Sequence, residues 1–288
     1  MSQDRKQVVL KQSHKTLKNF LEKKSEALPR NFNQTRFLQN CMTVLQDTKK
    51  IGQMEPVSVA RTMLKGAFLG LDFFNGECYA IPYGNSLNFQ TDWKGERKLA
   101  LKYSTEPIID IYAKNVHEND EFSCGVKDGK QYLDHKEAGF EQGEIIGSYC
   151  VALYESGTIK YEKMSRKEIE DIRDNFSKAP NSKAWRFTFG EMCKKVVTRR
   201  LCKGIELNFE NPEQDQAFEE GSGMEFEGST GEIEDSPFNE DEQQDEPVDV
   251  DYEEVEEEEE QEEEPSDEEF ADEISEKMEK QGMFEGDE

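Results

Sequence analysis

The sequence predicts an α+β fold, in which an antiparallel sheet containing a β-hairpin packs on helices, followed by a disordered acidic C-terminal tail. Two observations predict it. The apolar pattern has a helical period before residue 70 and after residue 165, and between these points it is mostly that of strands. Charge also divides the chain: residues 1–210 carry 34 Lys and Arg against 28 Asp and Glu, whereas residues 211–288 carry two Lys against 36 acidic residues. The net charge of −28 therefore describes a tail and not a domain.

The same division predicts three segments. Residues 1–28 are polar and lysine-rich, and they form either a helix or a loose basic arm. Residues 29–210 are long enough for one domain with a sizeable core. Residues 211–288 include an almost continuous glutamate run over 253–264 and bury too little apolar surface to offset about 1–2 kcal/mol of ordering per residue. We expect this tail to be disordered, with either a general solubility role or a specific regulatory one.

Two helices are expected after the arm. From Thr35, the residues Phe37, Cys41, Val44 and Leu45 recur at a spacing that puts them on one apolar face. A second helix is predicted from Pro56 to about Leu69, with Gly70 as its stop signal.

A β-hairpin and a third helix come next. Asn75-Gly76 and Gly84-Asn85 are turn signals on either side of an alternating run over 77–83, and a second run covers 86–90. Pro82 lacks an N–H group and therefore belongs at a strand edge or end. Residues 93–103 are predicted to be helical, with Lys94, Lys98 and Lys102 four residues apart in one charged stripe.

The remainder of the domain is predicted to be β-rich and then helical. Strands are expected over 107–116, 144–154 and 158–163, with a further hairpin at Asp128-Gly129. Ser165 and Glu168 form a capping box that begins a helix, and a polar loop follows Asn175 through residue 180. The last helix is expected over 189–201. Its buried face is predicted to contain Phe189, Met192, Cys193 and Val196, and its outward basic stripe Lys195, Arg199 and Lys203.

Several functional classes are disfavoured by what the sequence lacks. The six cysteines form no Cys-x-x-Cys pair, and the three histidines do not lie near them at ligand spacing, which argues against a zinc site of common pattern. The N-terminus has no apolar signal-peptide core, and no run approaches the roughly 20 apolar residues of a membrane span, so we expect a cytoplasmic protein with reduced thiols. The absence of a P-loop disfavours an ATP-driven recombinase or helicase.

Two basic helices carry the strongest chemical signal. One contains Lys94, Arg97, Lys98 and Lys102, with Phe89 and Trp93 beside it; the other contains Lys194, Lys195, Arg199, Arg200 and Lys203, with Arg186 and three aromatic residues beside it. Cations neutralise phosphates, and flat rings stack on unpaired bases for about 1–3 kcal/mol each. This combination suits a groove for single-stranded nucleic acid, although lysine stripes also form ordinary solvent-facing surfaces and tryptophan also fills cores.

Three motifs in order resemble the RecT family of phage single-strand annealing proteins. Residues 78–84 (CYAIPYG) followed by 89–95 (FQTDWKG) are similar to the family's Tyr-x-Ile-Pro-Tyr-Gly strand and Phe-Gln-x-Gly-Tyr-Lys-Gly turn. Trp185-Arg186 and the run over 192–201 (MCKKVVTRRL) resemble its last basic helix, and residues 28–71 resemble its opening helices. The resemblance covers about residues 28–205. It departs from the family pattern at Asp92, Trp93 and Val196, where the family often has Gly, Tyr and Thr.

The resemblance implies an ATP-independent protein that binds single-stranded DNA, pairs it with its complement and promotes homologous recombination and strand invasion in a phage or prophage system. It implies no covalent step and no cofactor, with magnesium left open as a modulator. The implied partners are single-stranded DNA, the annealed duplex, further copies of the chain in a ring or helical filament, an exonuclease and the host single-strand binding protein, in the cytoplasm of a bacterial host.

The resemblance and the basic helices together suggest roles for individual residues. We expect phosphate contacts from Lys94, Arg97, Lys98, Lys102, Lys194, Lys195 and Arg199, and groove-shaping or base contacts from Gln90 and Trp93. Arg186 and Arg200 complete the candidate DNA-binding set. Because Arg200 lies near the apolar face of its helix, a structural role with a packed stem is an alternative for it.

Two other functions remain as alternatives. The first is a non-enzymatic scaffold whose acidic tail binds basic partners. The second is a metal-dependent nuclease, for which Asp110, Glu144 and Glu155 lie in predicted strands and could converge. If the chain is an annealing protein, its tail is a candidate DNA mimic that competes for the basic groove, or else a solubility device.

Overall fold

The computed structural model describes residues 2–177 and 179–223. Helix α1 spans Ser2–Lys23, so the lysine-rich N-terminus adopts the helical one of the two conformations that the sequence left open. It is not a loose arm, because one face of it is buried: Val9, Leu10, Leu17 and Leu21 pack into the core beside α2 and α3. Residues beyond 223, where most of the disordered tail was predicted, lie outside the described residues.

The opening helices follow the predicted pattern closely. After a short 3₁₀ helix, η1 (Ser25–Ala27), helix α2 spans Gln34–Asp47 and buries Phe37, Cys41 and Leu45. A second 3₁₀ helix, η2 (Ile51–Gln53), leads to α3 over Pro56–Leu69. Gly70 ends α3 with a φ of 65°, the left-handed conformation that favours glycine, as the stop signal predicted.

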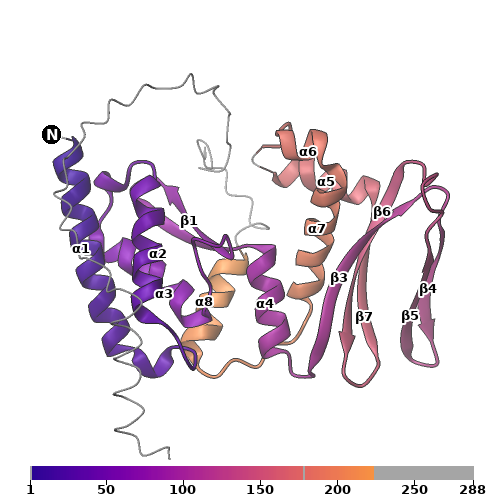
Figure 1. Ribbon diagram of the computed structural model, residues 1–288, viewed down its shortest axis with the longest axis horizontal. Coiled ribbons are helices and arrows are strands. Elements are labelled where there is room, and N and C mark those ends of the chain that lie inside the picture. Colours follow the sequence, from indigo (N-terminus) through magenta and orange to yellow (C-terminus); the bar gives the residue numbers. More distant parts are fainter. Residues whose placement is uncertain (1, 178, 224–288) are drawn as a thin grey trace, which may run out of the picture. The chain divides into compact units, whose positions relative to one another are not determined.

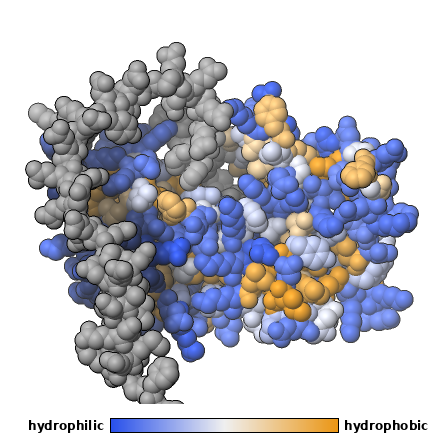
Figure 2. All heavy atoms as spheres, in the orientation of Figure 1, coloured by the Kyte–Doolittle hydropathy of each residue, from blue (hydrophilic) through white to orange (hydrophobic). Residues whose placement is uncertain are grey.

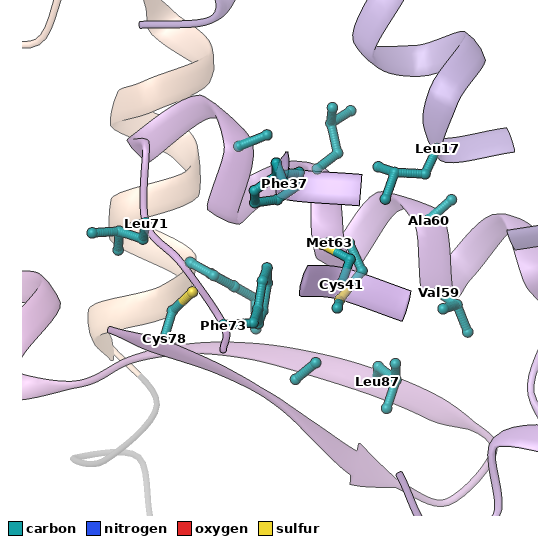
Figure 3. Close-up of a cluster of buried hydrophobic side chains, with 14 of the residues drawn as sticks. Leu17, Phe37, Cys41, Val59, Ala60, Met63, Leu71, Phe73, Cys78 and Leu87 are labelled. Carbon is teal, nitrogen blue, oxygen red and sulfur yellow. The ribbon is translucent and has the colours of Figure 1, made fainter. Parts of the chain in front are cut away.

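The predicted hairpin packs against the opening helices and closes one side of this first core. Strands β1 (Cys78–Tyr83) and β2 (Ser86–Thr91) are antiparallel, with Cys78 opposite Thr91 and Tyr83 opposite Ser86. Figure 3 shows side chains of α1, α2 and α3 gathered over one face of the hairpin, with Leu87 of β2 pointing into them. Helix α4 (Trp93–Tyr103) begins two residues after β2 ends.

A three-stranded antiparallel sheet forms the second part of the domain. Its strands are β3 (Ile108–His117), β6 (Ile145–Tyr154) and β7 (Ile159–Ser165), in the order β3-β6-β7. The hairpin predicted at Asp128-Gly129 consists of β4 (Glu121–Lys127) and β5 (Lys130–Lys136) and lies between β3 and β6 in the sequence. Figure 2 shows apolar residues reaching the surface over the three-stranded sheet. Among the exposed apolar side chains of this region are Ile109 and Tyr112.

Three helices follow the sheet. Helix α5 (Arg166–Phe176) starts with the predicted capping box, in which Ser165 and Glu168 each satisfy the other's backbone N–H group. The short α6 (Lys183–Phe187) comes after the loop that was predicted through residue 180 and was not itself predicted, and α7 spans Phe189–Lys203. Helix α7 packs its buried side against β3 and β6, where its residues meet Ile111, Cys150 and Ala152 in a second core.

The predicted start of the tail at residue 211 is too early. Residues Pro212–Ser222 form a further helix, α8, which packs against α3 and β2. Its buried Gln214 donates hydrogen bonds to the carbonyl of Phe68 (2.9 Å) and to the hydroxyl of Tyr103 (3.2 Å). The acidic composition of this stretch conceals one apolar face, formed by Ala217 and the half-buried Phe218.

Helix α4 lies between the two cores. Its Leu99 and Tyr103 belong to the helical core, whereas Ala100 belongs to the core under the sheet. Figure 1 shows α4 beside α7, with α5 and α6 at the end of α7 where it begins. Within the described residues, no helix is both long and apolar enough to cross a membrane.

Candidate nucleic-acid interface

The first turn of α4 is fixed to the β1–β2 hairpin by its backbone. Asp92 is the N-cap, and its carboxylate accepts a hydrogen bond from the N–H of Lys94 (3.4 Å), while its own N–H donates to the carbonyl of Glu77 (3.0 Å). A Cβ atom at Gly95 would lie 2.1 Å from that same carbonyl oxygen. Glycine is therefore required at position 95, and this close approach determines where Trp93 leaves the hairpin.

A buried ion pair joins α4 to α7. Arg199 Nε lies 3.2 Å from Glu96 Oε1, and the exposed fractions of the two side chains are 14% and 1%. Thr91 at the end of β2 donates a hydrogen bond to the same carboxylate oxygen (2.9 Å). The hairpin, α4 and α7 therefore meet at one carboxylate, beneath the surface on which the basic residues lie.

A pocket of about 540 Å³ opens between α4, α5, α6 and α7. Both tryptophans of the chain, Trp93 and Trp185, line it, together with Phe176. Four cations also line it: Lys195, Arg199, Arg200 and Lys203. The pocket thus combines aromatic walls with positive charge.

A second, smaller pocket of about 170 Å³ shares Trp93 and Lys195 with the first, so the two lie side by side along α7. It is lined also by Arg97 and Lys194. Arg97 is held in place by the carbonyl of Ile111 (2.8 Å from Nε), so its charge has a fixed position at the edge of β3. Together the two pockets form one groove with cations along it, which we call the basic groove.

Lys195 is the most available cation of the basic groove. It is exposed, and nothing in residues 2–177 and 179–223 holds its Nζ in a hydrogen bond or ion pair. The neighbouring cations are engaged: Arg97 pairs with Asp110 (2.8 Å), Lys194 with Glu191 (2.6 Å) and Arg200 with Glu162 (3.7 Å). Exposed pairs of this kind contribute about 0–1 kcal/mol, so they exchange readily for a phosphate partner.

Asp92 is the acidic residue within the larger pocket. Burial raises the pKa of its carboxyl group, opposed by the backbone hydrogen bond from Lys94 and by the positive charges of Lys195 and Arg199. Its placement among cations explains how an acid is tolerated where the resembling motif has glycine: the carboxylate caps α4 and faces positive charge from α7.

The predicted site residues divide into those that gather at the basic groove and those that do not. Six of the predicted residues line it: Trp93, Arg97, Lys194, Lys195, Arg199 and Arg200. The other five lie elsewhere. Gln90 is half-buried on β2, Lys94 is exposed at the start of α4, Lys98 and Lys102 lie away from the pockets, and Arg186 stands over the ring of Phe187 (5.5 Å).

Lys98 and Lys102 are engaged with the helical core. Lys98 Nζ lies 2.6 Å from a carboxylate oxygen of Glu77 and donates to the carbonyl of Gly70 (2.9 Å) at the end of α3. Lys102 Nζ donates to the hydroxyl of Tyr103 (2.8 Å). The stripe predicted from four-residue spacing exists, but it follows a different side of α4 from Trp93 and Arg97.

Two predictions about the faces of α7 are corrected. The buried face is formed by Cys193, Val197 and Leu201, whereas Met192 and Val196 are half-buried and line the larger pocket. The two arginines also exchange the positions that the sequence suggested. Arg199, predicted to face outward, is nearly buried against Glu96, while Arg200 is exposed.

Some residues of the basic groove were not among the predicted binding residues. Lys203 was recognised only as part of a stripe, and Phe176, the first residue of the predicted loop, instead ends helix α5. The amphipathic pattern of α5 ends at Phe176, which is exposed, and an exposed aromatic residue beside a basic helix is the signal that could have indicated it.

Two of the three carboxylates considered for a nuclease are engaged in separate ion pairs. Asp110 pairs with Arg97 (2.8 Å), and Glu144 pairs with Arg166 (2.6 Å). Over the described part of the chain, no group of three or more His, Cys, Asp or Glu side chains is arranged to hold a metal ion.

The fold and the basic groove define a class of protein: an α+β domain with an open, cation-lined groove whose walls are aromatic. Comparison with known proteins specifies the family. A model of the RecT family matches residues 35–232, and the chain belongs to this family. Membership supports a role in DNA recombination and annealing, as the sequence motifs indicated.

Two curated relatives extend this result. The chain is 27% identical to Protein RecT of Escherichia coli (strain K12) over 201 residues, which cover 66% of this chain and 72% of that protein. It is 24% identical to the uncharacterized protein YqaK of Bacillus subtilis (strain 168) over 254 residues, which cover 82% of this chain and 85% of the relative.

Proposed function

We propose that this protein binds single-stranded DNA in the basic groove and anneals it to a complementary strand without ATP. The observation that carries the proposal is the convergence on α4 and α7 of Lys195, Arg97 and Lys194 with Trp93. Cations along a groove neutralise successive phosphates, and aromatic side chains accept bases of any sequence. Membership of the RecT family supports the same activity.

The proposed mechanism is one of positioning. Phosphate contacts hold the bound strand extended, and Watson–Crick pairing with the incoming strand supplies the sequence specificity. No covalent bond forms or breaks in this process, so neither a nucleophile nor a cofactor is needed.

Several further aspects belong to the proposal through the family. The protein would act as a ring or helical filament of identical copies and hold single-stranded DNA and the annealed duplex in turn. It would work in the cytoplasm of a bacterial host with an exonuclease and the host single-strand binding protein. An oligomer would place many basic grooves in a row, which increases the positive field that each strand experiences.

The test is an annealing assay with the full-length protein and no ATP. Two complementary oligonucleotides carrying a fluorophore and a quencher are mixed with the protein, and a non-complementary pair serves as the control. We expect protein-dependent quenching with the complementary pair alone, together with DNA-dependent rings or filaments in electron micrographs. A pairing rate equal to the spontaneous one would overturn the proposal, and degradation of the strands in magnesium would favour the nuclease instead.

A further inference from the structure

The larger pocket of the basic groove has more apolar lining than phosphate binding requires. Trp185, which lines it, is only 6% exposed, and its Nε1 donates a hydrogen bond to Ser177 Oγ (3.2 Å) that fixes the plane of the indole. Aliphatic side chains from α5 and α7, those of Ile172, Met192 and Val196, complete this end. Phosphate is strongly hydrated, so this apolar end of the pocket is not a favourable site for it.

The polar groups of the pocket are arranged unevenly. The cations Lys195, Arg199, Arg200 and Lys203 line it along α7, whereas Asp92 is the one carboxylate among its lining residues in the described structure. A carboxylate repels a phosphate but accepts hydrogen bonds from the amino groups of nucleobases, as acidic side chains do with the N4 amino group of cytosine. The pocket therefore offers positive charge to a backbone and an acceptor to a base.

We propose that this pocket receives one unstacked nucleobase of the bound strand, packed against its aromatic side chains with the flanking phosphates on the α7 cations and its amino edge toward Asp92. This inference rests on the proposed function, because it concerns a base of the strand that the groove holds. The occupant is defined by its chemistry: a flat ring that carries an amino group and is joined to phosphate. Cytosine, adenine and guanine carry such a group, and thymine does not.

The proposal has a consequence for the bound strand. A base held in the pocket is withdrawn from the row that meets the incoming strand, so each protein copy would hold one base out of pairing until the duplex forms. When the base leaves the pocket, about 1–3 kcal/mol of stacking energy between the base and the aromatic side chains would be lost. The pocket would thereby place a weak base preference on a site that otherwise reads only backbone.

The test uses the fact that both tryptophans of the chain line this pocket, so intrinsic fluorescence reports its occupancy directly. The full-length protein is titrated with oligo(dC), oligo(dT) and an abasic deoxyribose-phosphate polymer of the same length. We expect quenching by oligo(dC), about five-fold weaker binding of oligo(dT), and no quenching by the abasic polymer even where it binds.

Two variants sharpen the result. Asp92→Asn keeps an N-cap side chain of equal quality for α4. We expect it to reduce the preference for oligo(dC) over oligo(dT) without weakening the binding of oligo(dT), because the charge that it removes repels phosphate. Val196→Phe fills the pocket from α7 and should abolish quenching while the abasic polymer still binds.

The outcomes separate this inference from the proposed function. Oligonucleotide binding without a change in tryptophan fluorescence, or equal quenching by the abasic polymer, would overturn the base pocket and leave DNA binding in the groove intact. A fluorescence change produced instead by removing residues 224–288 would assign the pocket to the protein's own chain and overturn the inference. A failure of every polymer to bind would refute the proposed function itself.

Discussion

Glu96 of α4 and Arg199 of α7 form an ion pair (3.2 Å) whose carboxylate is almost completely buried at the junction of the two cores. The pair lies where α4 leaves the hairpin, because Thr91 at the end of β2 donates to the same oxygen. Breaking a buried pair by removing one partner leaves an uncompensated charge, whereas both partners together are tolerated. The basic groove therefore depends on a structural contact directly beneath it.

The first prediction concerns Arg199. Arg199→Ala would leave Glu96 buried without its cation, and we expect the free energy of unfolding to fall by about 3 kcal/mol. Urea denaturation at neutral pH measures this, with Arg200→Ala as the matched control, because Arg200 is exposed and makes only a long pair with Glu162. Equal stability of the two variants would show that the buried pair does not hold α4 to α7.

The second prediction concerns Lys195, which is exposed in the middle of the basic groove. Lys195→Ala should weaken binding to all single-stranded DNA sequences alike and reduce the magnitude of the salt slope by about 1, since one phosphate contact is lost. The control is Lys127→Ala on β4, which removes the same charge from an exposed position outside both pockets. Identical salt slopes for the two variants would contradict the placement of DNA along α7.

The third prediction distinguishes the two sides of α4. Lys98 is already paired with Glu77 and the end of α3, so Lys98→Ala should change DNA affinity much less than Lys195→Ala does. Fluorescence anisotropy with a labelled oligonucleotide at two salt concentrations measures both. A loss for Lys98→Ala as large as that for Lys195→Ala would place the strand across the hairpin side of α4.

Local signals explain which elements could be predicted from the sequence. The β1–β2 hairpin, the capping box at Ser165 and the stop at Gly70 each depend on residues close together in the chain, and each is present. The buried face of α1 was harder to recognise, because five lysines lie among its apolar residues, of which only Val9, Leu10, Leu17 and Leu21 are buried. Helix α8 was missed for the same reason, since its acidic residues resemble the tail that follows.

Long-range contacts explain what the sequence could not predict. Nothing in the local pattern indicates that β3 pairs with β6 across the inserted β4–β5 hairpin. The positions of Arg199 and Arg200 were exchanged because an arginine that pairs with Glu96, 103 residues away, has no local signature. The composition of the candidate site was predictable, since basic residues and tryptophans are visible in the sequence, but the division of α4 into two sides required the fold.

The fourth prediction concerns how the stability of the protein depends on pH through Asp120, which lies just before the β4–β5 hairpin. Burial alone would raise the pKa of Asp120, but hydrogen bonds from the N–H groups of Ala138 and His117 and from the His135 ring hold it well below its usual range. A carboxylate whose pKa is lowered by folding stabilises the native state above its unfolded pKa of about 3.9, and that stability is lost as the pH falls below it. We therefore expect the contribution of Asp120 to be complete at pH 6 and smaller at pH 3.

The variant Asp120→Asn tests the direction of this pH dependence. It should be less stable than the unmodified protein at pH 6, and the difference between the two free energies of unfolding should narrow by pH 3. Asp134→Asn, an exposed acid on the same hairpin, is the matched control and should follow the unmodified protein at both pH values. A difference that widened toward pH 3 would contradict the low pKa of Asp120.

The last prediction concerns where the domain ends. Ending the chain after residue 210 removes α8, whose Gln214 is hydrogen-bonded to Phe68 and Tyr103 inside the helical core, so this version should be clearly destabilised. Ending it after residue 223 keeps α8 and removes only residues 224–288, which carry 32 acidic residues against two lysines. That version should unfold like the full chain yet bind single-stranded DNA more tightly, because a tethered polyanion repels the strand and competes with it for cations.

Affinity measured at low and high salt tests this, since the gain from removing charge must shrink as salt screens it. Equal affinity of the full chain and the 1–223 version at low salt would leave the acidic segment as a solubility device. Because the 1–223 version keeps every described contact of α8, a gain in its affinity can be attributed to charge, whereas a change seen with the 1–210 version would combine charge with the loss of structure.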